Sequence, residues 1–141
     1  MKLSTHGIKL SMNSPEYCLD THPLIWYFTQ ATTLSQSAKS ILEEIFRGAS
    51  RGILSPIVLL EIFHISRKNK KVVFSKFLKK LQKSNISLIS TDAAILGYCY
   101  QLPKSLEIHD RIIAATALAT QSVLITKDPE LRALQTIKTI W

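Results

Sequence analysis

The sequence predicts an α/β domain built on one mainly parallel sheet of about five strands. Two observations carry this prediction. Short apolar runs alternate with longer segments whose apolar residues recur at helical spacing, which is typical of parallel strands joined by right-handed helical crossovers. The 141 residues also contain no internal repeat, low-complexity tract or Gly/Ser linker, so we expect one domain over residues 15–141. Residues 1–14 are expected to be a disordered leader.

The first half of the domain provides two strands and three helices. The predicted strands are residues 17–20 and 53–55, and the predicted helices are residues 21–28, 35–46 and 56–68. Each strand is a short apolar run, and the first ends in Asp20. Pro23 is tolerated in the first turn of its helix, and Ser35 can cap the next one. Glu61 interrupts the apolar start of the third helix, and it needs an explanation because a charge is rarely buried without a partner.

Residues 67–83 are predicted to form a basic amphipathic helix. The segment contains no acid, and its apolar side chains recur at helical spacing. Its basic residues are Arg67, Lys68, Lys70, Lys71, Lys76, Lys79, Lys80 and Lys83. A strand at residues 86–89 follows, and Asp92 then starts a helix that ends before Pro103.

The last part of the chain centres on an alanine-rich helix at residues 109–119. This segment has no wide polar face, so we expect it to be buried against the sheet, with Asp110 capping its first turn. Asp128 stands just past the end of the strand that follows. The remaining elements are predicted as a strand at residues 123–126, a short helix at 129–134 and a strand at 137–140.

Composition narrows the class of protein. The formal net charge of +8 favours a polyanionic partner, although it says nothing about the fold. Cys18 and Cys99 lie in apolar runs and are typical of buried thiols in a reducing compartment. No apolar run approaches the roughly 20 residues of a membrane span, and residues 1–14 lack the apolar core of a signal peptide. We therefore expect a cytoplasmic protein without membrane association.

Four acids are expected at one edge of the sheet. Asp20 and Asp128 follow strands, and Asp110 begins a helix antiparallel to the next strand. Glu61 lies less than two turns into a helix that follows a strand. Two carboxylates about 4 Å apart repel by about 4 kcal/mol at an effective dielectric constant of about 20, so an ionised group requires a cation. All-oxygen ligands favour Mg²⁺ or Mn²⁺, and in a basic protein this predicts phosphodiester hydrolysis.

Four short motifs, in this order and spacing, resemble those of the PIN-domain ribonucleases, most closely the VapC-like toxins of bacterial type II toxin–antitoxin pairs. The motifs are Leu19-Asp-Thr-His-Pro-Leu-Ile-Trp26, Ser55-Pro-Ile with Leu60-Glu-Ile62, His109-Asp-Arg-Ile-Ile-Ala-Ala-Thr-Ala117, and Leu124-Ile-Thr-Lys-Asp128. Each is unspecific alone, but together they cover residues 17 to 141. The resemblance implies a PIN-like three-layer α/β/α domain.

The resemblance also implies a site and a mechanism. It assigns four carboxylates to a catalytic acidic pocket that binds Mg²⁺, with Mn²⁺ as an alternative: Asp20, Glu61, Asp110 and Asp128. Thr126, with Thr21, would support this pocket, and Glu61 would be a ligand or position the attacking water. The implied reaction is metal-dependent endonucleolytic cleavage of RNA. The implied partners are a second copy of the chain in a homodimer and a cognate antitoxin that blocks the pocket.

Several residues also have structural interpretations. Each aspartate of the pocket could cap a helix, which is compatible with metal binding, and Glu61 could be a solvated residue. His22 and His109 fit a structural or substrate-orienting role, and Trp26 and Tyr27 fit packing better than base stacking.

The candidates for RNA contact are basic residues: Arg67, Lys68, Lys70, Lys71 and Arg111. A lysine-rich segment can equally be a solvated face, and Arg111 could instead close a salt bridge. Two other functions stay open: an RNA-processing PIN nuclease without an antitoxin, and a non-catalytic RNA-binding module. A dinucleotide-binding domain is disfavoured because no Gly-rich loop follows a strand.

Overall fold

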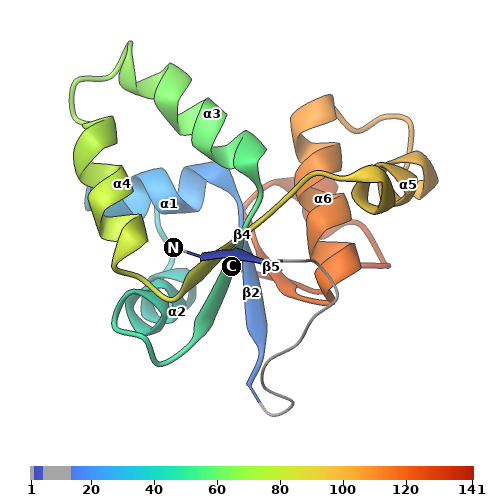
Figure 1. The fold of residues 1–141 in the computed structure, drawn as a ribbon, viewed down its shortest axis with the longest axis horizontal. Coiled ribbons are helices and arrows are strands. Elements are labelled where there is room, and N and C mark those ends of the chain that lie inside the picture. Colours follow the sequence, from blue (N-terminus) through green and yellow to red (C-terminus); the bar gives the residue numbers. More distant parts are fainter. Residues whose placement is uncertain (1, 5–13) are drawn as a thin grey trace.

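The computed structural model describes residues 2–4 and 14–141, and it contains one six-stranded sheet in the order β1-β4-β3-β2-β5-β6 (Figure 1). Every neighbouring pair of strands is parallel. The strands are β1 (Lys2–Ser4), β2 (Glu16–Leu19), β3 (Arg51–Leu54), β4 (Ile86–Ile89), β5 (Val123–Ile125) and β6 (Thr139–Ile140). The predicted α/β class and parallel sheet are therefore confirmed.

Five strands lie where the apolar runs predict them, and β1 is additional. It comes from the segment expected to be a leader and pairs with β4 at the edge of the sheet. The rest of that segment, residues 1 and 5–13, lies outside the described residues.

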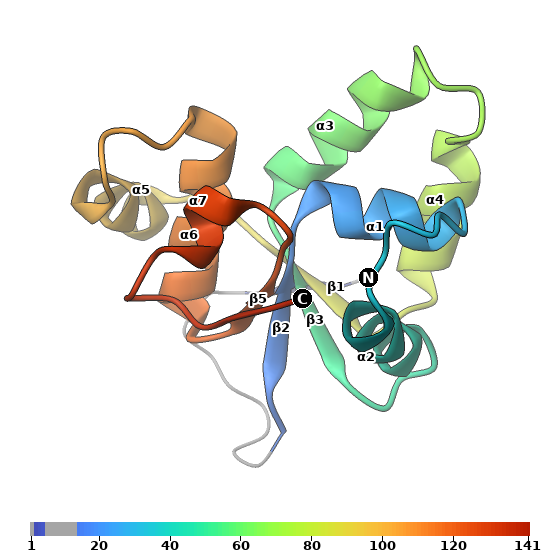
Figure 2. The same ribbon diagram turned by 180° about the vertical axis from the view of Figure 1, so that it is seen from behind.

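Helices cover both faces of the sheet, which gives the predicted three layers. They are α1 (Thr21–Phe28), α2 (Gln36–Phe46), α3 (Pro56–Ser66), α4 (Phe74–Gln82), α5 (Ala93–Gln101), α6 (Ile108–Thr120) and α7 (Pro129–Arg132). The first four lie on one side of the sheet, and α5, α6 and α7 lie on the other (Figures 1 and 2). Ser35 and Asp92 cap α2 and α5 as the sequence predicts, since their side chains accept backbone N–H groups of the first turn.

Two helix starts differ from the prediction. Residues 67–73 do not continue the basic helix; they form a turn in which the Asn69 side chain accepts the Lys71 N–H at 3.0 Å. The prediction that Asp110 caps its helix is also wrong. Helix α6 begins at Ile108 after Glu107, so Asp110 lies within the first turn and its side chain is left for another role.

Helix α6 is the buried helix that the sequence predicts. It packs against α5, α3, β2 and β5, and its alanines at positions 114, 115 and 117 are almost fully buried. Thr116 and Thr120 are also buried, and each hydroxyl donates to the carbonyl four residues earlier at 2.7 Å. With these hydroxyls satisfied, α6 lies close to the sheet and fixes where its first turn stands.

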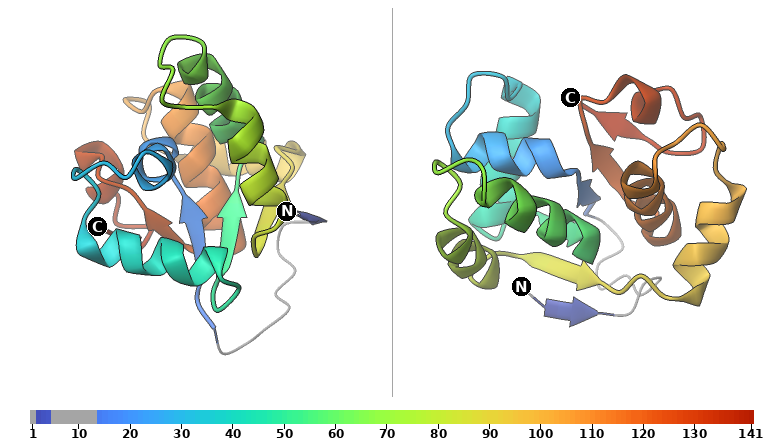
Figure 3. Two further views of the ribbon diagram at one scale, coloured as in Figure 1. Left: turned by 90° about the vertical axis from the view of Figure 1, so that its left-hand side faces the viewer. Right: turned by 90° about the horizontal axis from the view of Figure 1, so that it is seen from above.

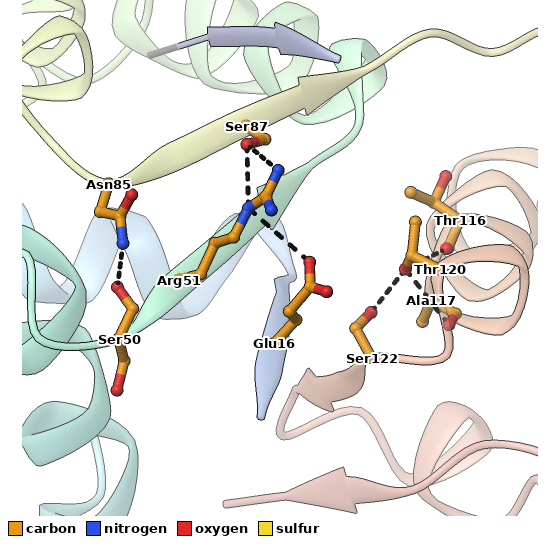
Figure 4. A network of polar contacts seen from close by, with 9 residues as sticks. All are labelled: Glu16, Ser50, Arg51, Asn85, Ser87, Thr116, Ala117, Thr120 and Ser122. Carbon is orange, nitrogen blue, oxygen red and sulfur yellow. Dashed lines mark hydrogen bonds and ion pairs between the residues drawn. The ribbon is translucent and has the colours of Figure 1, made fainter. Parts of the chain in front are cut away.

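The amino-terminal edge of the sheet is tied by polar contacts (Figure 4). Arg51 lies 3.7 Å from the Glu16 carboxylate and donates to the Ser87 hydroxyl at 2.8 Å, linking β2, β3 and β4. On the other side of β2, the Thr120 and Ser122 hydroxyls are 2.8 Å apart. Glu16 is therefore a buried acid with a cationic partner.

Candidate active site

The four predicted acids line one cavity of about 550 Å³. Asp20 follows β2, Glu61 lies on α3, Asp110 is in the first turn of α6, and Asp128 follows β5. Figure 3, seen from above, shows how α1, α3 and α6 surround the carboxyl ends of the central strands. The cavity thus occupies the edge at which open α/β folds place their ligands.

Asp20 is the most firmly held of the four. Its Oδ1 accepts the Thr21 N–H at 2.7 Å and its Oδ2 accepts the Thr126 hydroxyl at 2.7 Å. The Thr126 oxygen in turn accepts the Asp128 N–H at 3.0 Å, and Asp128 Oδ1 accepts the Glu130 N–H at 2.8 Å. Both aspartates therefore cap helices, and one buried hydroxyl joins them. Capping leaves each carboxylate lone pairs that can face the cavity.

Glu61 brings an unsatisfied oxygen to the same place. Its Oε1 and the Thr21 Oγ1 are buried and have no hydrogen bond of standard geometry. The Thr21 hydroxyl nevertheless lies close enough to lower the pKa of Glu61. Because a buried polar atom without a partner costs about 1–3 kcal/mol, the pair needs a further ligand such as water or a cation.

Burial and mutual repulsion disfavour the charged forms of three acids. Burial is the largest cause that raises the pKa of Asp20, although the hydrogen bonds from Thr126 and Thr21 oppose it. Burial likewise raises the pKa of Glu61. Burial, followed by the charges of the other three acids, raises the pKa of Asp110 to about 6. A cation in the cavity would reverse this pattern, since it stabilises each carboxylate.

The donor set fits a hard cation held partly by water. Carboxylates dominate the polar lining of the cavity, together with His22, His109 and Lys127, and carboxylate oxygens are typical ligands of Mg²⁺. In the part of the chain that the structure describes, no three His, Cys, Asp or Glu side chains are already grouped closely enough to hold a metal ion. Mg²⁺ usually keeps several waters and binds one or two carboxylates, so it does not require such a group.

The cavity wall also contains residues that the sequence left aside. His22 and His109 line it together with the acids, and the wall also includes Trp26, Glu107 and Lys127. Glu107 and Lys127 had no predicted role, although each is close in sequence to an acid of the motifs. Their position beside these acids in the sequence was the only signal that they line the cavity.

Most basic candidates lie elsewhere. Arg67, Lys68, Lys70 and Lys71 are exposed at and beyond the end of α3, and none of them lines the acidic cavity. Lys71 borders a separate cavity of about 180 Å³ between α1 and α4. These side chains could meet only a ligand that extends well past the acids.

Arg111 has internal partners. Its guanidinium donates four hydrogen bonds to backbone carbonyls at the end of α5 and in the α5–α6 loop. The acceptors are the carbonyls of Cys99, Leu102, Pro103 and Leu106. The structure therefore uses these donors to hold the loop that leads into the first turn of α6, and thus to Asp110, instead of leaving them for RNA.

The model of the PIN domain family matches residues 17–136 of this sequence. The chain belongs to the PIN-domain family. PIN domains are nucleases, so the acidic cavity is the candidate active site of a nuclease fold. A search of the curated proteins found no match to this PIN domain.

Solved structures agree on the fold. This PIN domain is similar to a chain of VapBC2 from Rickettsia felis bound to a DNA fragment from their promoter, with 21% identity, a TM-score of 0.66 and coverage of 89% of this chain and 97% of that one. A chain of a toxin–antitoxin complex from Klebsiella pneumoniae matches with 21% identity, a TM-score of 0.64 and coverage of 89% and 96%. A chain of DNA-bound VapBC from Salmonella typhimurium matches with 18% identity, a TM-score of 0.65 and coverage of 89% and 97%.

Within the described residues, no helix is both long enough and apolar enough to span a membrane.

Proposed function

We propose that this PIN domain is a Mg²⁺-dependent endoribonuclease, that Asp20, Glu61, Asp110 and Asp128 carry the reaction, and that it acts in the cytoplasm. The observation that carries the proposal is the convergence of these four carboxylates on one cavity from elements up to 108 residues apart (128 − 20). The chain belongs to a family of nucleases, and a buried oxygen of Glu61 and the buried Thr21 hydroxyl have no hydrogen-bond partner.

The proposed role of each residue follows from its hydrogen bonds and its exposure. Asp20 and Asp128 are fixed by their hydrogen bonds, so they are suited to bind a cation directly or through water. Asp110 is partly exposed on the other side of the cavity and would complete the ligand set. Glu61, with one free oxygen near Thr21, would bind the ion or orient the attacking water. When bound, Mg²⁺ would lower the pKa of that water and neutralise charge on the phosphate.

The charge of the chain supports a nucleic-acid substrate. The formal net charge of +8 favours a polyanionic ligand even though the cavity itself is acidic. The exposed basic residues after α3 offer contacts to a phosphate backbone. The carboxylates of the acidic pocket would hold a cation, which would supply positive charge toward a phosphate. RNA is proposed as the substrate from the motifs shared with PIN ribonucleases.

The metal mechanism is tested by cleavage of total RNA in Mg²⁺ and in EDTA, with Asp→Asn variants at positions 20 and 110. Asn caps a helix about as well as Asp but is a much weaker cation ligand, so at position 20, which caps α1, the substitution separates capping from catalysis. We expect loss of cleavage in EDTA and in both variants. Asp92→Asn is the matched control, because Asp92 caps α5 outside the cavity and should keep full activity. Equal cleavage in Mg²⁺ and EDTA would exclude the mechanism.

The proposed biological role is that of a toxin with a cognate antitoxin. The support is the fold shared with chains of VapBC and other toxin–antitoxin complexes. Expression of the chain alone should arrest growth, and coexpression with a small DNA-binding protein encoded next to it should relieve the arrest. Active nuclease without growth arrest would favour an RNA-processing role, and RNA binding without cleavage would favour a non-catalytic module.

A homodimer is also proposed, supported by apolar side chains that remain exposed on neighbouring helices. They are Leu60 and Phe63 on α3, Leu96 and Tyr100 on α5, and Ile108 at the start of α6. Light scattering during size-exclusion chromatography should give about twice the mass of one chain. The mass of a single chain at micromolar concentration would contradict the dimer.

A further inference from the structure

One wall of the acidic cavity is aromatic. Trp26 of α1 lines the cavity and is partly exposed, and the His22 ring lies 5.6 Å away at 44°. Behind it, Trp141 meets the Trp26 ring edge to face, at 5.6 Å and 67°. The ammonium of Lys127 lies over the Trp26 ring, 5.8 Å from its centre. His22 and Trp26 line the cavity together with the carboxylates, whereas Trp141 packs against the hydrophobic core.

The neighbouring aromatic residue shows what packing alone looks like. Tyr27 stacks on Phe46 at 5.1 Å and 5°, and it meets Phe28 edge to face. Tyr27 does not line the acidic cavity, whereas Trp26 does. Packing therefore accounts for Tyr27, whereas Trp26 is packed against Trp141 and still lines the acidic cavity with part of its surface exposed. The edge-to-face contact with Trp141 restricts the rotation of the indole.

We propose that Trp26 is a stacking platform for an unpaired nucleobase adjacent to the phosphate held at the acidic pocket. The inference rests on the proposed nuclease function and adds that the substrate is single-stranded at this position. Every base has a π-face, so such a platform recognises unpaired nucleotides with little sequence preference. A cavity of about 550 Å³ falls within the usual range of ligand sites and has room for a nucleotide.

A base can stack on Trp26 only after the Lys127 ammonium has left the face of the indole ring. The exposed cation–π contact of Lys127 with Trp26 is weaker than stacking of a base, so an incoming base can displace the ammonium. Lys127 directly precedes Asp128, so the released ammonium remains beside the acidic pocket, where it can pair with a phosphate.

The chain supplies its own probe, because Trp26 and Trp141 are its only two tryptophans. In Trp141→Phe, the fluorescence comes from Trp26 alone. We would titrate this variant in EDTA with single-stranded oligoadenylate of about 12 nucleotides, which is within the range of single-strand binding sites. The expected result is saturable quenching of Trp26. An abasic oligonucleotide with the same phosphates should bind weakly and quench little.

Substitution at position 26 provides the second measurement. Affinity for the same oligonucleotide should fall in the order Trp, Phe, Leu, with Trp26→Leu weakened roughly 5-fold or more. Lys127→Ala should instead lower the slope of log affinity against log salt by about one. Circular dichroism and thermal unfolding establish that each variant is folded; the titration of Trp141→Phe needs no change at position 26.

Two results would overturn the inference. One is an affinity that does not change from Trp to Leu in folded variants, and the other is equal quenching by abasic and oligoadenylate probes. Because the titrations contain no divalent metal, they are independent of catalysis. Quenching by RNA without any cleavage in Mg²⁺ would refute the proposed nuclease function but not the platform.

Discussion

Replacing Asp110 by Asn should stabilise the folded protein above pH 6. Burial, followed by the charges of Asp128, Asp20 and Glu61, raises the pKa of Asp110 from 3.8 to about 6. The folded state therefore binds the proton more tightly than the unfolded chain does. As pH rises from about 4 to about 6, the wild type loses stability by ionising this group, and the full penalty is present above pH 6. Asn carries no charge and escapes the penalty.

The size of the gain follows from the two pKa values. The difference between 3.8 and about 6 sets an upper limit of about 3 kcal/mol. Asp110 is partly solvated, which reduces this figure. Its carboxylate also lies in the first turn of α6, where losing the interaction with the helix dipole costs about 0.3–1 kcal/mol. We expect a net gain of about 1 kcal/mol at pH 7.5 and none below about pH 4.

Urea unfolding at pH 7.5 and pH 4 in EDTA, followed by circular dichroism, measures this difference. Mg²⁺ should then stabilise the wild type more than Asp110→Asn, because the ion removes the same repulsion. Asp92→Asn serves as the control, since Asp92 lies outside the cavity, and Mg²⁺ should stabilise this variant as much as it stabilises the wild type. If Asp110→Asn is less stable than the wild type at pH 7.5, or if its effect is the same at both pH values, the electrostatic reasoning is wrong.

Three further changes test the scaffold around the site. Thr126→Val removes the donor to Asp20 and should cost about 2–3 kcal/mol in urea unfolding, with Thr126→Ser restoring most of it; equal stability of the Val and Ser variants would contradict this. Arg111→Met leaves four carbonyls without their donor, so it should lower the free energy of unfolding by about 2 kcal/mol or more and speed amide exchange in the α5–α6 loop. Unchanged exchange would show that the loop does not depend on these hydrogen bonds. Gly52→Ala would place a Cβ 2.8 Å from Cγ1 of Ile86 and should lower stability by about 1–3 kcal/mol in thermal unfolding, so an unchanged Tm would show that the strands can separate.

The sequence by itself determined the elements whose signals are local. Apolar runs located five strands, and polar residues at helix starts located α2 and α5. Both signals come from residues that are close together in the sequence. The order of the motifs also identified the PIN family, which the family model confirms over residues 17–136. The same local rule failed at Asp110, where capping and ligation look alike in sequence. It failed again at residues 67–73, where a local Asn69 turn replaces helix.

Only the tertiary structure decided which side chains meet. The bond from Thr126 to Asp20 joins residues 106 apart, and nothing along the chain specifies its geometry. The unpartnered oxygens of Thr21 and Glu61 likewise come from different helices. Arg111 could have faced RNA, and only the folded α5–α6 loop gives its guanidinium four carbonyls. The sequence supplied four acids, but the burial and repulsion that raise the pKa values of Asp20, Glu61 and Asp110 arise only when the parallel sheet brings its strand ends together.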